Sequence, residues 1–358
     1  MKADSSVLTL GLSRRRKIVF AIVAFVTVTV ALFVCLLVLD IYLHHRVEGV
    51  AGVNVWGYRG PVVGRKPPGE TRVVTLGGST VFGFGLPWTE AWPYYLERQI
   101  NAARPGQVPA RVVNLGVPRD SAGTYVATID DYDYLKGDVV VLYEGYNDLE
   151  PPLPNDETKR QLPTYLAWRH QSPIFRWTGY FPILPLVFNE KAMMLLHGGN
   201  LNAAYGSGEI VFTPGLATRV TAGALKATAD IEVALEQRFG RLTASEPAFS
   251  TAYDATCGRW SQYCGATADA VRHARQRGQR VLVVTQPYLS DLHVDQQRAL
   301  AASLQRQFGG DSQVRYVNLG RLVDLHDPQL AYDGLHLTAS GNERIAAALG
   351  PAVIEMLR

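Results

Sequence analysis

Hydrophobic residues dominate one long segment near the start of the chain. The run from Ile18 to Leu39 has 22 residues and is interrupted only by Thr27 and Thr29. As a helix it would be about 33 Å long, enough to cross a bilayer core of about 30 Å. A signal peptide has a shorter apolar region, usually about 7–15 residues, and a small-residue cleavage site. The pattern therefore favours an uncleaved membrane helix over residues 18–43, with a cleaved signal peptide as the competing interpretation.

Basic residues gather in front of this segment. The first 17 residues carry five Lys or Arg side chains and one acidic side chain (Lys2, Arg14, Arg15, Arg16, Lys17; Asp4). The positive-inside rule therefore predicts a cytoplasmic stub over 1–17 and a single-pass protein whose domain is periplasmic or extracellular. The whole chain has a net charge of +3 and the stub contributes +4, so the remainder is near −1. No basic face suggests a nucleic-acid partner.

Short apolar runs and helical patterns alternate beyond the membrane segment. Residues 44–69 are rich in Gly and Pro and indicate a loop that tethers the following domain, residues 70–358. Five β-branched runs predict strands (72–77, 110–116, 138–145, 280–287, 313–319), and four segments predict helices (89–103 with Thr89 as its cap, 120–136, 251–277, 339–357). This order predicts a three-layer α/β/α, flavodoxin-like fold around a parallel sheet of about five strands.

A large insertion separates the third predicted strand from the fourth. The alternation stops over about 150–250, and loops of this length are often lids over functional sites. Aromatic side chains gather in its first part (Tyr165, Trp168, Phe175, Trp177, Tyr180, Phe181). They are expected to cap a site, stack on sugar rings or rest on the bilayer; the alternative is that they form a small core for the insertion.

Two of the three cysteines leave a choice between a disulfide and free thiols. Cys35 lies in the membrane segment, whereas Cys257 and Cys264 lie outside the membrane on the predicted topology. On one continuous helix their Cα atoms would be about 10 Å apart, too far for a bridge. A disulfide, which an oxidising compartment would permit, therefore requires a break near Gly258. Two thiols without nearby histidines do not make a zinc site, so no metal or cofactor is expected.

Chemically useful residues follow the predicted strands. Ser79 lies in "GGST" after the first strand, Gly116 follows the second, and Asn147 lies in "GYND" after the third. Asp333 and His336 lie in "YDGLH" after the fifth strand. Ligands bind beyond the carboxyl ends of the strands in open parallel sheets, so these residues are expected to meet at one edge. Together they supply the groups needed for acyl transfer.

This set resembles the SGNH (GDSL-like) hydrolase superfamily, whose name denotes serine, glycine, asparagine and histidine from four separate blocks. The resemblance covers residues 70–150 and 275–358, and the Asp-x-x-His spacing of the last block is present. The first block departs from the usual Gly-Asp-Ser, because Gly78 stands in place of the aspartate. The resemblance implies a membrane-anchored serine ester hydrolase.

The residue types assign a role to each group. His336 would take the proton of the Ser79 hydroxyl, and Asp333 would hold the histidine ring in the correct tautomer. The backbone N–H groups of Ser79 and Gly116 and the side-chain amide of Asn147 would form the oxyanion hole. The alternative base is His326, which has an aspartate on either side (Asp324, Asp327) but lacks the Asp-x-x-His spacing.

Several functions remain open at this point. The resemblance includes many carbohydrate esterases, so the predicted substrate is an O-acetylated envelope or secreted polysaccharide, with lipid or thioester substrates as further possibilities. An O-acetyltransferase would use the same residues, with a sugar hydroxyl in place of water. The departure at Gly78 also leaves a polysaccharide-binding or assembly protein without catalytic activity as an alternative.

Overall fold

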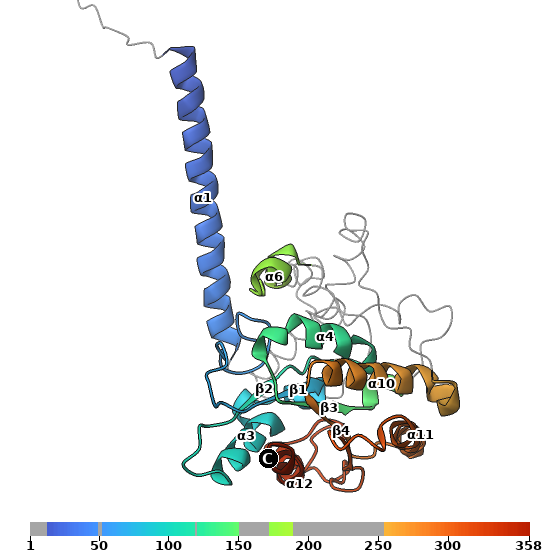
Figure 1. Ribbon diagram of the computed structural model, residues 1–358. Helices are drawn as coiled ribbons and strands as arrows, with labels where there is room; N and C mark the ends of the chain where they lie inside the picture. The colour runs from blue at the N-terminus through green and yellow to red at the C-terminus, as the bar shows by residue number, and fades with distance from the viewer. Residues whose placement is uncertain (1–12, 49–51, 119, 150–171, 189–253) are drawn as a thin grey trace, which may run out of the picture.

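The computed structural model describes five parts of the chain: residues 13–48, 52–118, 120–149, 172–188 and 254–358. Much of the predicted insertion, including Tyr165 and Trp168, lies outside the described residues. Figure 1 shows one long helix that projects from an α/β domain.

The centre of the domain is the predicted parallel sheet. Its strands are β1 (Arg72–Gly77), β2 (Arg111–Asn114), β3 (Val139–Glu144), β4 (Arg280–Thr285) and β5 (Val314–Asn318). They run parallel in the order β2-β1-β3-β4-β5, which is the flavodoxin-like order. The predicted fold class is therefore confirmed, and several predicted strands end earlier than expected, where their last residues begin the loops at the carboxyl edge.

Helices cover both faces of the sheet. α3 (Trp92–Ala102) and α12 (Ala339–Met356) lie on one side, and α4 (Tyr125–Asp131) and α10 (Ser261–Gln276) lie on the other (Figure 1). Successive side chains of a strand point to opposite faces. Val140 and Leu142 of β3 accordingly join the core under α4 and α10, and Val139 and Val141 join the core under α3 and α12. β3 is buried along its whole length, as its continuous apolar run predicts.

Three helix predictions need correction. Thr89 is not the cap of α3, because it lies in a separate 3-10 turn, Trp88–Glu90, and α3 begins at Trp92. The helix predicted over 120–136 is divided into two 3-10 turns (Ala122–Thr124, Asp133–Leu135) and α4 between them. α11 (Asp291–Phe308) was not predicted, because its buried face includes polar side chains that weaken the apolar periodicity (His293, Gln296, Gln297, Ser303).

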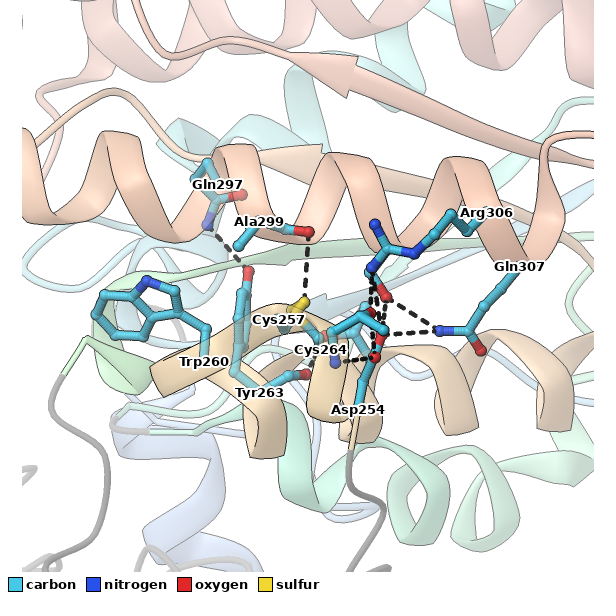
Figure 2. Close-up of a disulfide and its surroundings, with 12 residues drawn as sticks. Asp254, Cys257, Trp260, Tyr263, Cys264, Gln297, Ala299, Arg306 and Gln307 are labelled. Carbon is cyan, nitrogen blue, oxygen red and sulfur yellow. Dashed lines mark hydrogen bonds and ion pairs between the residues drawn. A yellow bond between two sulfur atoms is a disulfide. The ribbon is translucent and has the colours of Figure 1, made fainter.

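The helix predicted over 251–277 is also broken, and the break allows a disulfide. A 3-10 segment, Ala255–Trp260, precedes α10, and Gly258 inside it has φ 57° and ψ −128°. This break brings the Cα atoms of Cys257 and Cys264 to 6.5 Å, and the two sulfurs are bonded (Figure 2). Of the two alternatives left by the sequence, the structure has the disulfide.

Replacing Cys257 and Cys264 together by serine is expected to lower the free energy of unfolding by about 2–3 kcal/mol. The bridge closes a short loop in the unfolded chain, and removing it returns conformational entropy to that state. Denaturant unfolding of the two proteins in detergent measures the difference. Cys35→Ser, which leaves the bridge intact, is the control; equal midpoints for all proteins would contradict the expectation.

The candidate membrane helix is α1 (Arg14–Val47). Among the described residues it is the one helix long and apolar enough to cross a membrane, and none of its most apolar window is buried. It contains the predicted span over 18–43 and extends beyond it at both ends. Two residues near the C-terminal end of α1, Asp40 and His44, differ from the exposed apolar window because they are buried.

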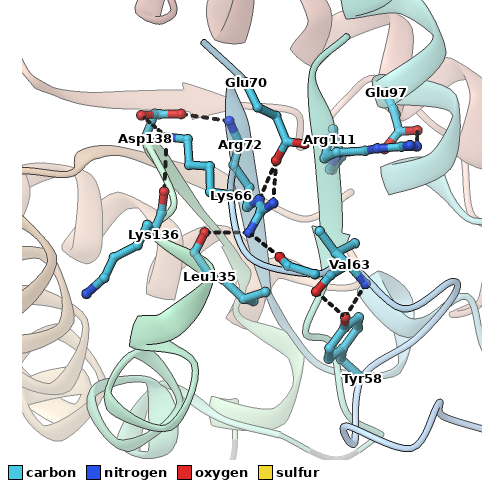
Figure 3. Close-up of polar contacts among 12 residues, drawn as sticks. Tyr58, Val63, Lys66, Glu70, Arg72, Glu97, Arg111, Leu135, Lys136 and Asp138 are labelled. Atoms are coloured by element: carbon cyan, nitrogen blue, oxygen red, sulfur yellow. Dashed lines mark hydrogen bonds and ion pairs between the residues drawn. The ribbon is translucent and has the colours of Figure 1, made fainter. Parts of the chain in front are cut away.

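The segment predicted as a tether is packed on the domain where the structure describes it. The Tyr58 hydroxyl accepts a hydrogen bond from the Val63 N–H at 2.6 Å, and Lys66 Nζ lies 2.6 Å from Asp138 Oδ1 (Figure 3). Asp138 Oδ2 also accepts from the backbone N–H of Arg72 at 2.7 Å. The prediction of a loop over 44–69 needs correction at its start, because residues 44–47 belong to α1. Residues 52–69 contain neither helix nor strand and are fixed to the first strand and the residues before β3.

Candidate active site

The sequence after β1 places Ser79 at the carboxyl edge of the sheet. Gly78 follows the strand, and Ser79 is the first residue of a single-turn helix, α2 (Ser79–Phe82). A Cβ atom at position 78 would lie 2.4 Å from Asn147 Nδ2, closer than real contacts allow. With glycine at position 78, the Asn147 amide lies close against the serine turn, and a larger residue would require that amide to shift.

His336 and Asp333 reach Ser79 from the loop between β5 and α12. His336 Nε2 lies 2.8 Å from Ser79 Oγ, and His336 Nδ1 lies 2.7 Å from Asp333 Oδ2. The loop is closed by an isolated bridge between Ala331 and Leu337, which fixes the turn that carries both residues. Because the carboxylate can only accept, Nδ1 carries the proton and Nε2 is free to accept the Ser79 hydroxyl proton.

The carboxylate of Asp333 is held in its charged form. Burial raises the pKa of this group, but hydrogen bonds from the His336 ring and from the backbone N–H groups of His336 and Leu335 outweigh burial, and the pKa lies below its ordinary value. Those N–H groups donate to Asp333 Oδ1 at 2.6 and 3.0 Å. Asp333 is therefore an ionised acceptor at neutral pH and its second oxygen fixes the histidine ring.

Two aromatic rings pack against the ring of His336. Phe84 lies with its ring centroid 5.0 Å away, and Tyr332 is stacked at 5.9 Å. The Tyr332 hydroxyl donates to the Phe84 carbonyl oxygen at 2.6 Å, which ties the two residues together. The imidazole is therefore restrained by packing as well as by Asp333. Neither aromatic residue carried a signal in the sequence analysis.

Asn147 brings an amide to the same edge. It lies in a 3-10 turn after β3, Tyr146–Asp148, and its Nδ2 donates to the Asp120 carbonyl oxygen at 2.6 Å. The amide group has a second N–H, which this contact leaves available. The Ser79 N–H begins α2, where N–H groups lack partners inside the helix, and it has no acceptor in the part of the chain described.

Gly116 is placed differently from the other predicted oxyanion donors. Its N–H donates to Asn114 Oδ1 at 2.9 Å, and Asn114 Nδ2 donates to the Val81 carbonyl oxygen at 2.7 Å. A Cβ atom at position 116 would lie 2.6 Å from the Phe82 nitrogen. Glycine is therefore needed here for the close packing of α2, and in this structure its N–H is already bound.

Gln286 connects the serine turn to the asparagine turn, and sequence reasoning missed it. This buried side chain follows β4; its Nε2 donates to Thr80 Oγ1 at 2.6 Å and its Oε1 accepts from the Tyr146 N–H at 2.8 Å. Thr80 is adjacent to Ser79, and Tyr146 is adjacent to Asn147. One amide therefore fixes the spacing of the two turns. Its position just after a strand was the available signal.

Two carboxyl groups beside the asparagine turn carry less charge than their number suggests. Burial raises the pKa of Glu144 well above its ordinary value, and its Oε1 accepts from Thr267 Oγ1 at 2.8 Å. Burial also raises the pKa of Asp148 to about 7, although a hydrogen bond from the Ala122 N–H opposes this. The raised pKa of Glu144 favours its uncharged form, which limits the negative potential near Asn147.

The competing histidine is not part of this cluster. The side chain of His326 is 92% exposed, and its Nδ1 lies 3.2 Å from Asp324 Oδ1. Among the residues that the structure describes, no group of three His, Cys, Asp or Glu side chains is arranged to hold a metal ion. The described site is therefore made of a serine, a histidine, an aspartate and amide donors.

Comparison with known proteins gives structural matches alone. No protein-family model matches the sequence, and a search of curated proteins finds no match. The chain is similar to a lipolytic protein of the G-D-S-L family from Desulfitobacterium hafniense (10% identity, 80% of this chain and 99% of that chain, TM-score 0.38). It is also similar to a family 3 carbohydrate esterase from Clostridium thermocellum (12%, 80% and 98%, 0.42).

A third similar structure is an acetylxylan esterase mutant from Geobacillus stearothermophilus (12% identity, 78% of this chain and 92% of that chain, TM-score 0.39).

Proposed function

We propose that this chain is a membrane-anchored serine esterase that acts outside the cytoplasm on acylated carbohydrate. The observation that supports this most strongly is the continuous chain of hydrogen bonds from Ser79 through His336 to Asp333, at 2.8 and 2.7 Å. The three side chains come from opposite ends of the domain sequence and meet at the carboxyl edge of the sheet, where such folds bind ligands.

The proposed reaction has two stages. Ser79 Oγ attacks the ester carbonyl carbon while His336 Nε2 takes the hydroxyl proton, and Asp333 stabilises the resulting imidazolium. The imidazolium then gives this proton to the leaving alkoxide as the bond between carbonyl carbon and alkoxide oxygen breaks. Water repeats the sequence on the acyl-serine: His336 removes a proton from it, and the carboxylic acid leaves with Ser79 restored.

The negative charge that forms on the carbonyl oxygen needs donors that are already in place. The Ser79 N–H and the second N–H of Asn147 are the two donors that the geometry favours. Gly116 is expected from the sequence to be a third donor, but its N–H donates to Asn114 Oδ1. In the proposed mechanism its role is therefore to allow the close packing of α2. Gln286 keeps the two donor-bearing turns at a fixed spacing.

The proposed location rests on charge and cysteine chemistry. The basic residues before α1 favour a cytoplasmic N-terminus, which puts the domain on the opposite side of the membrane. The disulfide between Cys257 and Cys264 is typical of an oxidising compartment such as the periplasm. Acylated envelope or secreted polysaccharide is available there, and it is the substrate class implied by the family resemblance.

Labelling with a fluorophosphonate tests the serine assignment. The wild-type protein in detergent is expected to form a covalent adduct at Ser79 and to hydrolyse a chromogenic acetate. Ser79→Ala is expected to do neither, and Ser312→Ala serves as the control that retains both. Adduct formation that survives in Ser79→Ala would exclude the proposed nucleophile, and no adduct on the wild type would favour a binding protein without catalytic activity.

A further inference from the structure

The segment over residues 172–188 presents two kinds of apolar side chain. One set is buried in the domain core (Phe175, Phe181, Ile183, Leu186). The other set is exposed: Trp177 is 89% exposed, Phe188 59% and Ile174 44%. Ile174 and Trp177 belong to α6 (Pro173–Thr178), which ends at Gly179 with φ 73°. The segment is therefore fixed by its buried residues while a second apolar surface faces outward.

The same segment is attached to the end of α1. The Leu184 N–H donates to Asp40 Oδ1 at 2.5 Å, and the Tyr180 hydroxyl donates to the same carboxylate. His44 Nε2 lies 2.7 Å from the Phe181 carbonyl oxygen, and both His44 and Asp40 are buried. These contacts hold the domain directly against the end of α1. They fix the orientation of the domain relative to the helix.

The attachment point lies at the end of the apolar run. The run ends at Leu39, and Asp40 is the next residue. A span of this length reaches across the hydrocarbon core, so residues 40–44 lie at the level of the lipid headgroups. Figure 1 shows α6 on the side of the domain from which α1 emerges, with α12 on the opposite side of the sheet. The exposed side chains of the segment therefore lie beside the outer membrane–water interface.

We propose that Ile174, Trp177 and Phe188 form an interfacial surface that inserts into the headgroup region of the membrane that α1 crosses. This rests on the anchoring part of the proposed function. Tryptophan is favoured at membrane–water interfaces, because its ring is apolar and its indole N–H still finds a partner there. Arg176, on the same helix, supplies a cation for lipid phosphate.

Lipid fits this surface better than a protein partner because the segment that carries it is bonded to the end of the membrane helix. Val38 and Leu39, which directly precede the attachment point, are themselves exposed. The surface gives the enzyme two fixed contacts with one membrane, which restricts rotation of the domain about α1.

Site-specific quenching tests the proposal on the full chain. The protein is reconstituted into vesicles of phosphatidylcholine and phosphatidylglycerol, with or without lipids that carry a nitroxide at the headgroup or along the acyl chain. A fluorophore is attached at Ile174→Cys in a Cys35→Ala background, which retains Trp177. Ala347→Cys, an exposed position on α12, is the matched control, and the wild-type Cys35 is labelled separately to report on the span.

The label at 174 is expected to lose at least half of its fluorescence with headgroup nitroxide, while the label at 347 loses none. Adding Trp177→Asp is expected to reduce the quenching at 174 at least twofold, because a charged residue resists insertion. Quenching at Cys35 but not at 174 would overturn the interfacial surface and leave the anchor intact. A Cys35 label that acyl-chain nitroxide does not quench would overturn the anchor and this inference together. Phosphonate labelling of Ser79 in the same vesicles reports folding and the catalytic proposal separately.

Discussion

Replacing His336 by alanine is expected to lower kcat/KM for a small chromogenic acetate by about ten-thousand-fold or more. Within the described residues, His336 is the one side chain at hydrogen-bond distance from Ser79 Oγ, and without a base the hydroxyl is a weak nucleophile at neutral pH. Losses of this size are typical when a member of such a triad is removed. Initial rates in detergent over a range of acetate concentrations measure the effect.

His326→Ala is the matched control for this substitution. Both histidines have an aspartate at hydrogen-bond distance from Nδ1, but only His336 has Ser79 at Nε2. The His326 variant is therefore expected to keep kcat/KM within about twofold of wild type. A large loss in the His326 variant, with activity retained in the His336 variant, would move the base to the other Asp-His pair.

The sheet was predictable because its signal is local. Each strand is a short run of β-branched and apolar residues, and β3 in particular is buried on both faces. The helices were less predictable, because their ends depend on tertiary contacts. The Trp92 N–H, which begins α3, donates to Asn342 Oδ1 at 3.0 Å, and this partner lies on α12, 250 residues away. Thr89 is a good capping residue by type, but the N-terminal N–H of α3 is bound by the Asn342 side chain instead.

The candidate site was predictable only in part. Ser79, Asn147, Asp333 and His336 each follow a strand, so the topology of a parallel sheet brings them to one edge. Gln286 also follows a strand, yet an isolated glutamine carries no catalytic signal. Its importance becomes visible when the structure shows both ends of its amide engaged, with Thr80 and with Tyr146.

Some contacts required knowledge of neighbouring loops. Phe84 and Tyr332 meet across His336 because a hydroxyl-to-carbonyl hydrogen bond joins two segments that are 248 residues apart. The partner of the Gly116 N–H was likewise not predictable from the sequence. Asn114 lies only two residues away, but its side chain is held by a hydrogen bond to the Val81 carbonyl oxygen in α2. Sequence position therefore proposed Ser79, Asn147, Asp333 and His336, while the contacts among these residues and their neighbours depended on the fold.

Asn147→Ala is expected to lower kcat by about a hundred- to a thousandfold with a much smaller change in KM. The amide acts on the oxyanion, which exists in the transition state and not in the bound ester, so its loss affects the chemical step most. Steady-state kinetics with the chromogenic acetate separate the two constants. Phosphonate labelling of the variant at a reduced rate would show that Ser79 and His336 remain in place.

Gly78→Ala tests the role of the Asn147 amide by a different substitution. The added methyl group would lie 2.4 Å from Asn147 Nδ2, so the amide must move away from the serine turn. We therefore expect a loss of kcat similar to that of Asn147→Ala, and no further loss when the two substitutions are combined. Such non-additivity is the signature of two changes that remove one interaction. Losses that multiply in the double variant would mean that position 78 acts independently of Asn147, and the explanation given for its glycine would be wrong.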